Sequence, residues 1–441
     1  MKARKFIDLF SGCGGLSLGL SMAGMQGLFA VERDPMAFET FAANFVSGSL
    51  TQRHAFEWPS WLQQQAWGID ELLKQHKKEL RQLRGQVDIL AGGPPCQGFS
   101  FAGRRIEDDP RNQLFEKYVE AVDAIRPAAL ILENVPGMRV VHRRSNIVEI
   151  PFGPAPKKRS FYDKLAEKLD GIGYEVEAIL VDASRFGVPQ RRSRLIAIGV
   201  RKDLSHWLDG GIARVFALIE EERVRQLALL GLGESVSAFD AISDLETAGT
   251  ELRPCEDPES ARGFLEARRG EATSGYQRLM RGDSEDTPNS MRLARHRDDV
   301  RERFARILAE CRRGVRMDDE SRRSYGLKKH RIYPMSATNP APTITTLPDD
   351  VLHYSEPRIL TVRESARLQS FPDWFQFKGK YTTGGDRRTK ECPRYTQVGN
   401  AVPPFLARAL GSALDKALAE IELTSRLFGQ ASTQPALAAT R

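Results

Sequence analysis

Short apolar runs alternate with amphipathic stretches along the first two hundred residues. The apolar runs are rich in Ile, Leu, Val and Phe, which is typical of buried strands. The stretches between them repeat apolar residues at helical spacing, as Phe38, Phe41 and Phe45 do after Pro35. The predicted strands cover 5–10, 27–32, 87–91, 128–133, 174–183 and 194–200, and the predicted helices cover 16–24, 35–45, 114–125 and 162–169. This alternation predicts an α/β fold with a doubly wound parallel sheet, in which ligands bind at the carboxyl ends of the strands.

The alternation ends near residue 200. Beyond it, charged helical stretches mix with irregular segments that carry Gly and Pro, and an amphipathic pattern returns only over 401–421. The stretch 60–86 is polar and helix-prone, and we interpret it as an insertion in the first domain. The predicted organisation is a first domain over 1–200, a smaller irregular domain over 201–355, a further segment over 356–425 and a disordered tail over 426–441.

Charge and hydropathy indicate the location of the protein and the partners that it can bind. No apolar run approaches the length of a membrane span, and the amino terminus lacks the apolar stretch of a signal peptide, so we expect a cytoplasmic protein. The formal net charge is +7, and arginines crowd residues 262–331. Because acidic residues are interleaved there, a solvated helical face and contact with a nucleic acid both stay open.

The cysteines of the chain do not form the pattern of a disulfide or zinc framework. Cys13, Cys96, Cys255, Cys311 and Cys392 are scattered, odd in number and without C-x-x-C spacing. Neither a disulfide framework nor a zinc site is therefore expected, and the histidines form no cluster for another metal. A thiol with a function in this chain has to act alone.

A glycine-rich turn follows the first predicted strand in "DLFSGCGGLSLG". Gly12 and Gly14 let the backbone turn tightly and approach a ligand, and Glu32 ends the next strand, where an acid can bind ribose hydroxyls. The third glycine of a dinucleotide fingerprint would fall at Ser17. The pattern favours an adenosine-bearing ligand without a pyrophosphate, and a turn that only packs helix against strand stays the alternative.

Cys96 lies on a stiff corner after the strand that ends near residue 91, in "GGPPCQGFS". The two prolines fix the backbone, and Gly98 allows a partner to approach closely. A free cysteine is usually a small buried hydrophobe. Its place at the carboxyl end of a strand in this class of fold favours a positioned nucleophile instead.

Two further strand ends carry charged side chains. Glu133 follows an apolar run in "ILENVPGM", and Arg192 and Arg194 share one face at the start of the strand in "QRRSRLIAIG". An acid at a buried strand end is costly unless it is paired or functional. A capping carboxylate and a surface strand remain the structural alternatives for these residues.

The ordered succession of these motifs resembles the cytosine-C5 DNA methyltransferases. The resemblance covers nearly all of 4–200 and about 340–420. "FIDLFSGCGGLSLG" resembles the motif that binds S-adenosylmethionine, "GGPPCQGFS" the nucleophile loop, "ENV" the glutamate motif and "QRRSR" the arginine motif. "RILTVRESARLQSFPD" resembles the segment that supports the recognition domain, and "QVGNAVPP" the motif that returns to the cofactor pocket.

The resemblance implies roles for individual residues. Cys96 is expected to add to C6 of cytosine, Glu133 to hold N3 and the exocyclic amine, and Arg194 with Arg192 to orient the base or the cysteine loop. Glu32 is expected on the ribose of S-adenosylmethionine. The other residues expected at the cofactor are Asp8, Phe10, Ser11, Gly12, Cys13, Gly14, Gly15, Arg33, Pro94, Leu114, Asn400, Ala401 and Val402. The family's third cofactor motif has its candidate near "RHAFEW".

The resemblance also implies the partners. Residues 1–200 would be the catalytic domain, 201–355 the target-recognition domain and 356–425 the support segment and the return to the catalytic domain. We expect a monomer that binds duplex DNA, associates with the nucleoid, binds no membrane and works beside a separate restriction endonuclease. Two alternatives stay open: methylation of RNA, as in a transfer-RNA branch of the family, and a catalytically silent DNA-binding paralogue.

Overall fold

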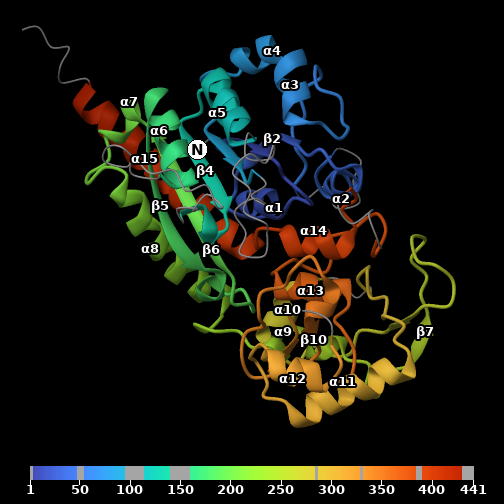
Figure 1. Cartoon of the computed structure of the whole chain (residues 1–441). Helices are drawn as coiled ribbons and strands as arrows, with labels where there is room; N and C mark the ends of the chain where they lie inside the picture. The colour runs from blue at the N-terminus through green and yellow to red at the C-terminus, as the bar shows by residue number, and fades with distance from the viewer. Residues whose placement is uncertain are drawn as a thin grey trace, which may run out of the picture.

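The structure is a computed structural model, and it describes residues 3–46, 54–94, 114–139, 159–283, 287–327, 331–383 and 390–429. Two lobes are visible in Figure 1. The sheet lobe consists of a six-stranded sheet with the helices packed on it, α1 to α8 and α15. The second lobe contains α9 to α13 and the short strands β7 to β10, and α14 lies between the lobes.

The sheet confirms the predicted doubly wound α/β class. Its strand order is β2-β1-β3-β4-β6-β5. The strands are β1 (Lys5–Leu9), β2 (Gln26–Val31), β3 (Ile89–Gly92), β4 (Ala129–Asn134), β5 (Tyr174–Asp182) and β6 (Ser193–Arg201). The expectation of a wholly parallel sheet is wrong for β6, which runs antiparallel to both β4 and β5. A short connection joins β5 to β6, and a parallel return would need a longer crossover.

The helices predicted over 16–24, 35–45, 114–125 and 162–169 are observed as α1 (Gly15–Met22), α2 (Pro35–Phe45), α5 (Leu114–Ile125) and α6 (Phe161–Gly171). The other helices of the sheet lobe are α3 (Ile69–Gln75), α4 (Lys77–Gln82), α7 (Lys202–Ser205), α8 (Ala213–Leu230) and α15 (Pro404–Gly429). Asp34 caps α2 by accepting hydrogen bonds from the backbone N–H groups of Met36 and Ala37, and Pro35 supplies the first turn. Local capping therefore fixes where this helix starts.

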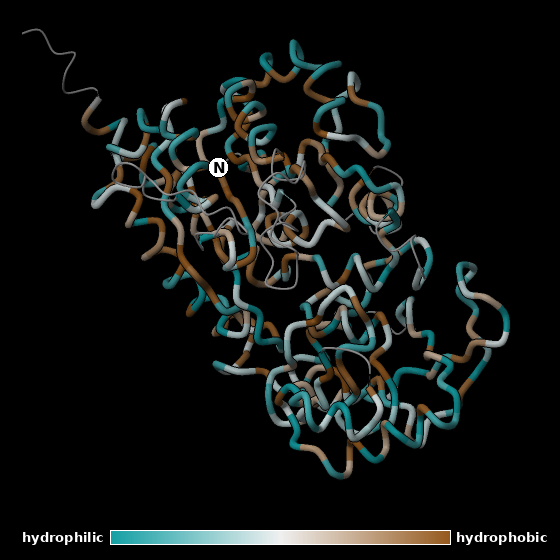
Figure 2. The backbone as a smooth tube through the Cα atoms, viewed as in Figure 1, coloured by the Kyte–Doolittle hydropathy of each residue, from teal (hydrophilic) through white to brown (hydrophobic). Residues whose placement is uncertain are grey.

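The polar stretch 60–86 folds as part of the sheet lobe. It contains α3 and α4, and both helices pack against α5. Leu72, Leu73 and Leu80 are buried there, while the residues between them are mostly exposed. Hydrophobic residues run along the strands of the sheet, and hydrophilic residues alternate with them on these outer helices (Figure 2). The helical spacing of these buried leucines is thus consistent with the two helices, although the composition of the stretch is polar.

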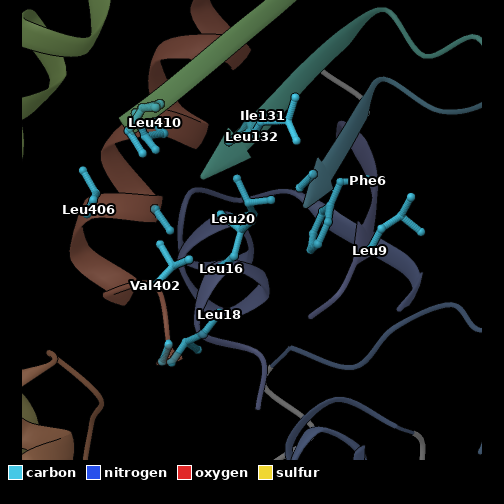
Figure 3. Close-up of a cluster of buried hydrophobic side chains, with 14 of the residues drawn as sticks. Phe6, Leu9, Leu16, Leu18, Leu20, Ile131, Leu132, Val402, Leu406 and Leu410 are labelled. Carbon is cyan, nitrogen blue, oxygen red and sulfur yellow. The ribbon is translucent and has the colours of Figure 1, made fainter. Parts of the chain in front are cut away.

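The carboxyl-terminal helix returns to the sheet lobe and packs on α1 and α8. Leu16 and Leu20 of α1 lie in one buried cluster with Leu406 and Leu410 of α15 (Figure 3). A Cβ on Gly19 would lie 2.3 Å from the Cβ of Ala407, so only glycine allows this close approach.

The carboxyl-terminal residues differ in part from the predicted tail. The helix α15 continues to Gly429, so the first four residues of the predicted tail 426–441 are helical. Residues 430–441 lie outside the described part of the chain. The domain limits at 200 and 355 stay predictions, although α8 packs with the sheet lobe through the side-chain amide of Gln226, which donates to the carbonyls of Phe186 and Phe405.

The second lobe is built from shorter elements. Its helices are α9 (Ala238–Ile242), α10 (Gly275–Arg281), α11 (Asp298–Glu310), α12 (Asp319–Ser324) and α13 (Val362–Leu368), and α14 covers Arg394–Asn400. Its strands are β7 (Leu252–Pro254), β8 (Leu265–Ala267), β9 (Tyr333–Pro334) and β10 (Val351–Leu352). All seven residues of α13 are buried, including Arg363 and Arg367. Buried charge is therefore a main component of this lobe.

Candidate active site

The glycine-rich turn after β1 is held in left-handed backbone conformations. Phe10, Gly12 and Gly14 have φ of 61°, 57° and 95°. A Cβ on Gly14 would lie 2.4 Å from the ring of Phe45, and a Cβ on Gly15 would lie 2.3 Å from the carbonyl oxygen of Val402. The turn therefore needs glycine both for its dihedral angles and for two close contacts.

The contact between Gly15 and Val402 joins the two segments that are predicted to form the cofactor pocket. Val402 follows α14 and is buried together with Ala401, whereas Asn400 is exposed. The contact between Gly15 and Val402 brings the segment after α14 against the amino-terminal end of α1. Residues predicted from opposite ends of the sequence are thus neighbours in the fold.

Two carboxylates lie under the turn. Asp8 is 1 % exposed and accepts a hydrogen bond from the Ser17 hydroxyl at 2.6 Å. Burial raises the pKa of Asp8 to about 7, although the hydrogen bond from Ser17 opposes the shift. Glu32 accepts the backbone N–H groups of Gly12 at 2.9 Å and Asp34 at 2.7 Å, and burial raises its pKa. Glu32 thereby fixes the turn after β1 relative to the end of β2.

Unpartnered polar atoms in this region fit a polar ligand. Among the residues that the structure describes, the Ser11 hydroxyl and Oδ1 of Asp8 are buried and have no hydrogen-bond partner. A Cβ on Gly12 would meet no atom of these residues within 4 Å, so they leave the space beside this backbone open. Buried polar groups usually have partners, so these atoms and this space fit the hydroxyls and amines of an adenosine-type cofactor.

Three other predicted cofactor residues, Cys13, Arg33 and Leu114, differ in how far they are exposed. The Cys13 side chain does not border the open space, because its Sγ lies 3.7 Å from the carbonyl oxygen of Gln397 in the core. Burial raises the pKa of this thiol to about 12, so it stays protonated. Arg33 is exposed, and Leu114 is half-buried against the core at the start of α5.

Glu133 and Arg194 form an ion pair at the carboxyl edge of the sheet. Nε of Arg194 lies 2.6 Å from Oε1 of Glu133, and each side chain is 11 % exposed. Glu133 stands near the end of β4, and Arg194 near the start of the neighbouring antiparallel strand β6. The antiparallel direction of β6 is what brings the arginine to the same edge as the acid.

The segment leading to Cys96 reaches this ion pair. A Cβ on Gly93 would lie 3.5 Å from Oε2 of Glu133, and the Asn134 amide donates to the carbonyl of Pro94 at 3.1 Å. Gly93 and Pro94 follow β3, the strand beside β4. Cys96 itself lies outside the described residues, two positions beyond Pro94.

Arg192 is placed at a junction of segments that are distant in sequence, and its expected role at the base or the cysteine loop stays a prediction. It is 2 % exposed, and its guanidinium donates to the carbonyls of Ile344 at 3.0 Å, Gly399 at 2.9 Å and Ala401 at 3.1 Å. These contacts hold the end of α14 and the segment before β10 against β6. Arg192 is thus a positioning residue in this arrangement, whereas Arg194 is the arginine that faces Glu133.

Comparison with known proteins agrees with this geometry. Residues 4–416 match the model of a protein family described as C-5 cytosine-specific DNA methylase.

The chain belongs to this family.

Relatives of similar length support the assignment. The type II methyltransferase M.DdeI of Desulfomicrobium norvegicum is 30% identical, with 92% of this chain and 88% of the relative covered. The type II methyltransferase M1.HphI of Haemophilus parahaemolyticus is 31% identical, with 93% and 86% covered. A prophage-encoded E. coli protein, described as a DNA modification methyltransferase, has a solved structure with a TM-score of 0.60 and 25% identity, and the match covers 95% of this chain and all of that one.

These matches confirm the prediction of a DNA cytosine-5 methyltransferase and do not favour the RNA alternative. No helix in the described ranges is long and apolar enough to cross a membrane. Among the same residues, no group of three or more His, Cys, Asp or Glu side chains is arranged to hold a metal ion.

Sequence reasoning missed several polar residues that assemble the methyltransferase site. Asn134 holds the start of the nucleophile loop through Pro94. Gln190 is fully buried, donates to the carbonyl of Leu368 and accepts the backbone N–H of Ile344. The Gln397 side chain accepts a hydrogen bond from the Thr40 hydroxyl and donates hydrogen bonds to three backbone carbonyls. Each of them stands inside a quoted motif, which was the available signal, but their partners are distant in sequence.

Proposed function

We propose that this methyltransferase transfers a methyl group from S-adenosylmethionine to C5 of a cytosine within a specific duplex DNA sequence. The ion pair of Glu133 and Arg194, beside Gly93 at the start of the nucleophile loop, carries the proposal. An acid and a cation held together at the carboxyl edge of this sheet lie where such folds bind their ligands. The loop that bears Cys96 begins against them.

The proposed reaction starts with the thiolate of Cys96. Its sulfur bonds to C6 of the cytosine, and the electrons of the C5–C6 double bond make C5 nucleophilic. When bound, S-adenosylmethionine supplies the methyl group as an electrophile. Loss of the C5 proton to a base then restores the double bond and releases the Cys96 sulfur. A free cysteine has a pKa of about 8.5, and we propose that Arg194, which pairs with Glu133 beside the start of this loop, favours the thiolate.

Glu133 and Arg194 are proposed to hold the base during this reaction. The carboxylate of Glu133 is proposed to accept a hydrogen bond from the exocyclic amine, and a proton that it shares with N3 neutralises the charge that develops when C6 is attacked. Arg194 keeps that carboxyl in place through the ion pair at 2.6 Å. Because a stacked base cannot reach this edge, we propose that the cytosine is turned out of the helix into the site.

The cofactor is proposed to bind at the glycine-rich turn. Glu32 would hold the ribose, and the open side of Gly12 with the unpartnered Ser11 hydroxyl would receive other polar groups. Asn400, Ala401 and Val402 would close the pocket from the segment after α14. The proposed partners are duplex DNA and a separately acting restriction endonuclease, and we propose a monomer in the cytoplasm, associated with the nucleoid.

Transfer of labelled methyl from S-adenosylmethionine to duplex DNA tests the proposal. Wild-type protein is expected to label DNA, and Cys96→Ser is expected to abolish labelling because the hydroxyl is a much weaker nucleophile. Cys311→Ser, a change of a half-buried thiol in the second lobe, is the matched control and should keep full activity. Sequencing of the methylated DNA identifies the base and its context.

Three results would contradict the proposal. They are label on RNA but not on DNA, label on adenine, and undiminished transfer by Cys96→Ser.

A further inference from the structure

The second lobe has a cavity with a basic lining that no role above uses. Its volume is about 730 Å³, and its lining is mostly polar. The lining residues are Arg253, Arg268, Arg269, Gly270, Glu271, Arg281 and Thr287. Four arginines around one cavity are unusual for a purely structural void, because their like charges repel one another.

Three of these arginines are held in place by carboxylates. Arg253 contacts Glu266, its cross-strand partner on β8, at 2.9 Å. Arg269 contacts Asp373 at 2.9 Å, and Arg281 contacts Asp244 at 2.5 Å. The positions of the guanidinium groups are therefore fixed before any ligand arrives, which lowers the entropy cost of binding.

The lining of the cavity carries four arginines and one acid, Glu271. Asp244 and Asp373, which hold Arg281 and Arg269, are both also bound by Arg367 of α13, at 3.0 Å and 2.6 Å. A cation in a partly enclosed, mostly basic lining attracts an anion more strongly than a fully solvated one would.

Arg268 is the most available cation of the lining. It is exposed, and within the described ranges it makes no ion pair or hydrogen bond. It follows β8 and adjoins Arg269, so it stands on a short strand pair whose position is fixed. Leu293 N–H donates to the Leu265 carbonyl at 2.8 Å, and the Arg292 guanidinium lies 4.1 Å from the ring centroid of Phe264.

This side of the second lobe is connected to the sheet lobe. Asn289, two residues after the lining residue Thr287, donates to the carbonyl of Phe377 at 2.8 Å. The neighbouring Lys378 donates its backbone N–H to the Thr40 hydroxyl on α2, at 2.8 Å. These two hydrogen bonds connect this side of the second lobe to α2 of the sheet lobe.

We propose that this cavity holds a phosphate of the DNA backbone, an assignment that rests on the proposed function. Arginine is suited to phosphate because its planar fork offers paired donors. Such a contact positions the duplex and carries no sequence information of its own. Glu271, the one acid in the lining, opposes the phosphate and limits the affinity.

Two variants of opposite sign test the cavity. Arg268→Ala is expected to weaken binding of a short duplex roughly tenfold, equally for specific and unrelated sequences, as for loss of one charge-assisted hydrogen bond. The slope of log affinity against log salt should fall by about 1. Glu271→Gln is expected to shift affinity and slope the other way, which general damage to the fold would not do.

Arg301→Ala is the matched control, because Arg301 is exposed on α11 and does not line the cavity. It should leave affinity and slope near those of the wild type. An equal loss in Arg301→Ala, or no change in Arg268→Ala, would overturn the assignment. A larger loss of wild-type affinity for DNA in phosphate buffer than in chloride at equal ionic strength, absent in Arg268→Ala, would support the assignment, because phosphate then competes with DNA at Arg268. Binding of inorganic phosphate that depends on Arg268 but leaves the affinity for DNA unchanged would assign the cavity to free phosphate and overturn it.

A wrong assignment of the cavity and a wrong proposed function would give different results. Wild-type protein that binds duplex DNA through Arg268 but labels no cytosine would contradict the proposed methyl transfer and leave the assignment of the cavity unaffected. Protein that labels cytosine while Arg268→Ala matches the control would contradict the cavity alone.

Discussion

The two lobes are stabilised by different kinds of buried groups. The sheet lobe closes over apolar side chains, such as the cluster of α1, α15 and the central strands in Figure 3. The second lobe is organised around guanidinium groups, of which Arg363 and Arg367 are completely buried. Arg367 binds Asp244 and Asp373, and Arg363 donates to backbone carbonyls and to Asn289.

This difference has an energetic consequence. Apolar packing is spread over many small contacts, so loss of a single contact is tolerated. A buried ion pair depends on both partners, because the one left behind keeps the full desolvation penalty. The second lobe should therefore be sensitive to single charge changes, while its shape is set by the directions of a few guanidinium groups.

The lobes should also respond to pH with opposite sign. Burial raises the pKa of Asp8 in the sheet lobe, so folding favours its protonated form. Burial would raise the pKa of Asp373 too, but the hydrogen bond and charge of Arg367 outweigh it and lower that pKa below its ordinary value. Stability from Asp8 is lost as pH rises through its folded pKa, and stability from Asp373 is lost as pH falls through its own.

The largest expected effect is on the ion pairs of the second lobe. Arg367→Met should lower the free energy of unfolding by about 3–5 kcal/mol, because Asp244 and Asp373 lose the cation that they share. Fluorine NMR of protein labelled with 5-fluorotryptophan measures this in urea. Trp374, beside Asp373, is the only tryptophan after residue 207 and reports on this lobe.

An exposed ion pair of the sheet lobe is the matched control. Arg214 contacts Glu420 at 2.8 Å with side-chain exposures of 30% and 38%, so Arg214→Ala should change stability by only about 0–1 kcal/mol. If Arg367→Met has no larger effect than Arg214→Ala, the second lobe is not stabilised by its buried charges and the comparison fails.

A smaller effect is expected at the first turn of the sheet lobe. Wild-type stability should contain a contribution from protonated Asp8 that is complete below about pH 4 and lost by the time pH passes about 7. Asp8→Asn keeps the oxygen that accepts the Ser17 hydroxyl but cannot ionise. Its unfolding free energy, measured in urea from about pH 5 to about pH 8, should therefore lack this decline.

The slope with pH, and not the absolute stability of the variant, is the result to compare. An identical decline in wild type and Asp8→Asn would mean that Asp8 is ionised in the folded protein throughout this range.

The sequence predicted most of the sheet lobe because local signals coincide there. The helix predicted over 35–45 is the observed α2, and Asp34 with Pro35 explains its start. The helix predicted over 114–125 is the observed α5. Alternating apolar and amphipathic stretches are set by neighbours in the chain, so they can be read from the sequence.

Features that depend on distant partners could not be predicted in this way. The arginine-rich stretch left a solvated face and nucleic-acid contact open, yet Arg269 and Arg281 bind carboxylates that lie far from them in sequence. The motif placed Arg192 and Arg194 on one face, but the carbonyls that Arg192 binds belong to residues more than a hundred positions away.

The most direct test of the proposed function uses a duplex in which the target cytosine carries fluorine at C5. The reaction contains S-adenosylmethionine, so that methyl transfer leaves both fluorine and methyl on C5. Because no C5 proton then remains to be removed, the bond between Cys96 and C6 should persist, and mass spectrometry of the denatured protein should show the DNA attached to Cys96. We predict this adduct in wild type and in Cys311→Ser, and none in Cys96→Ser. Attachment through another residue, or methylation of ordinary DNA by a protein that never forms the adduct, would contradict the account.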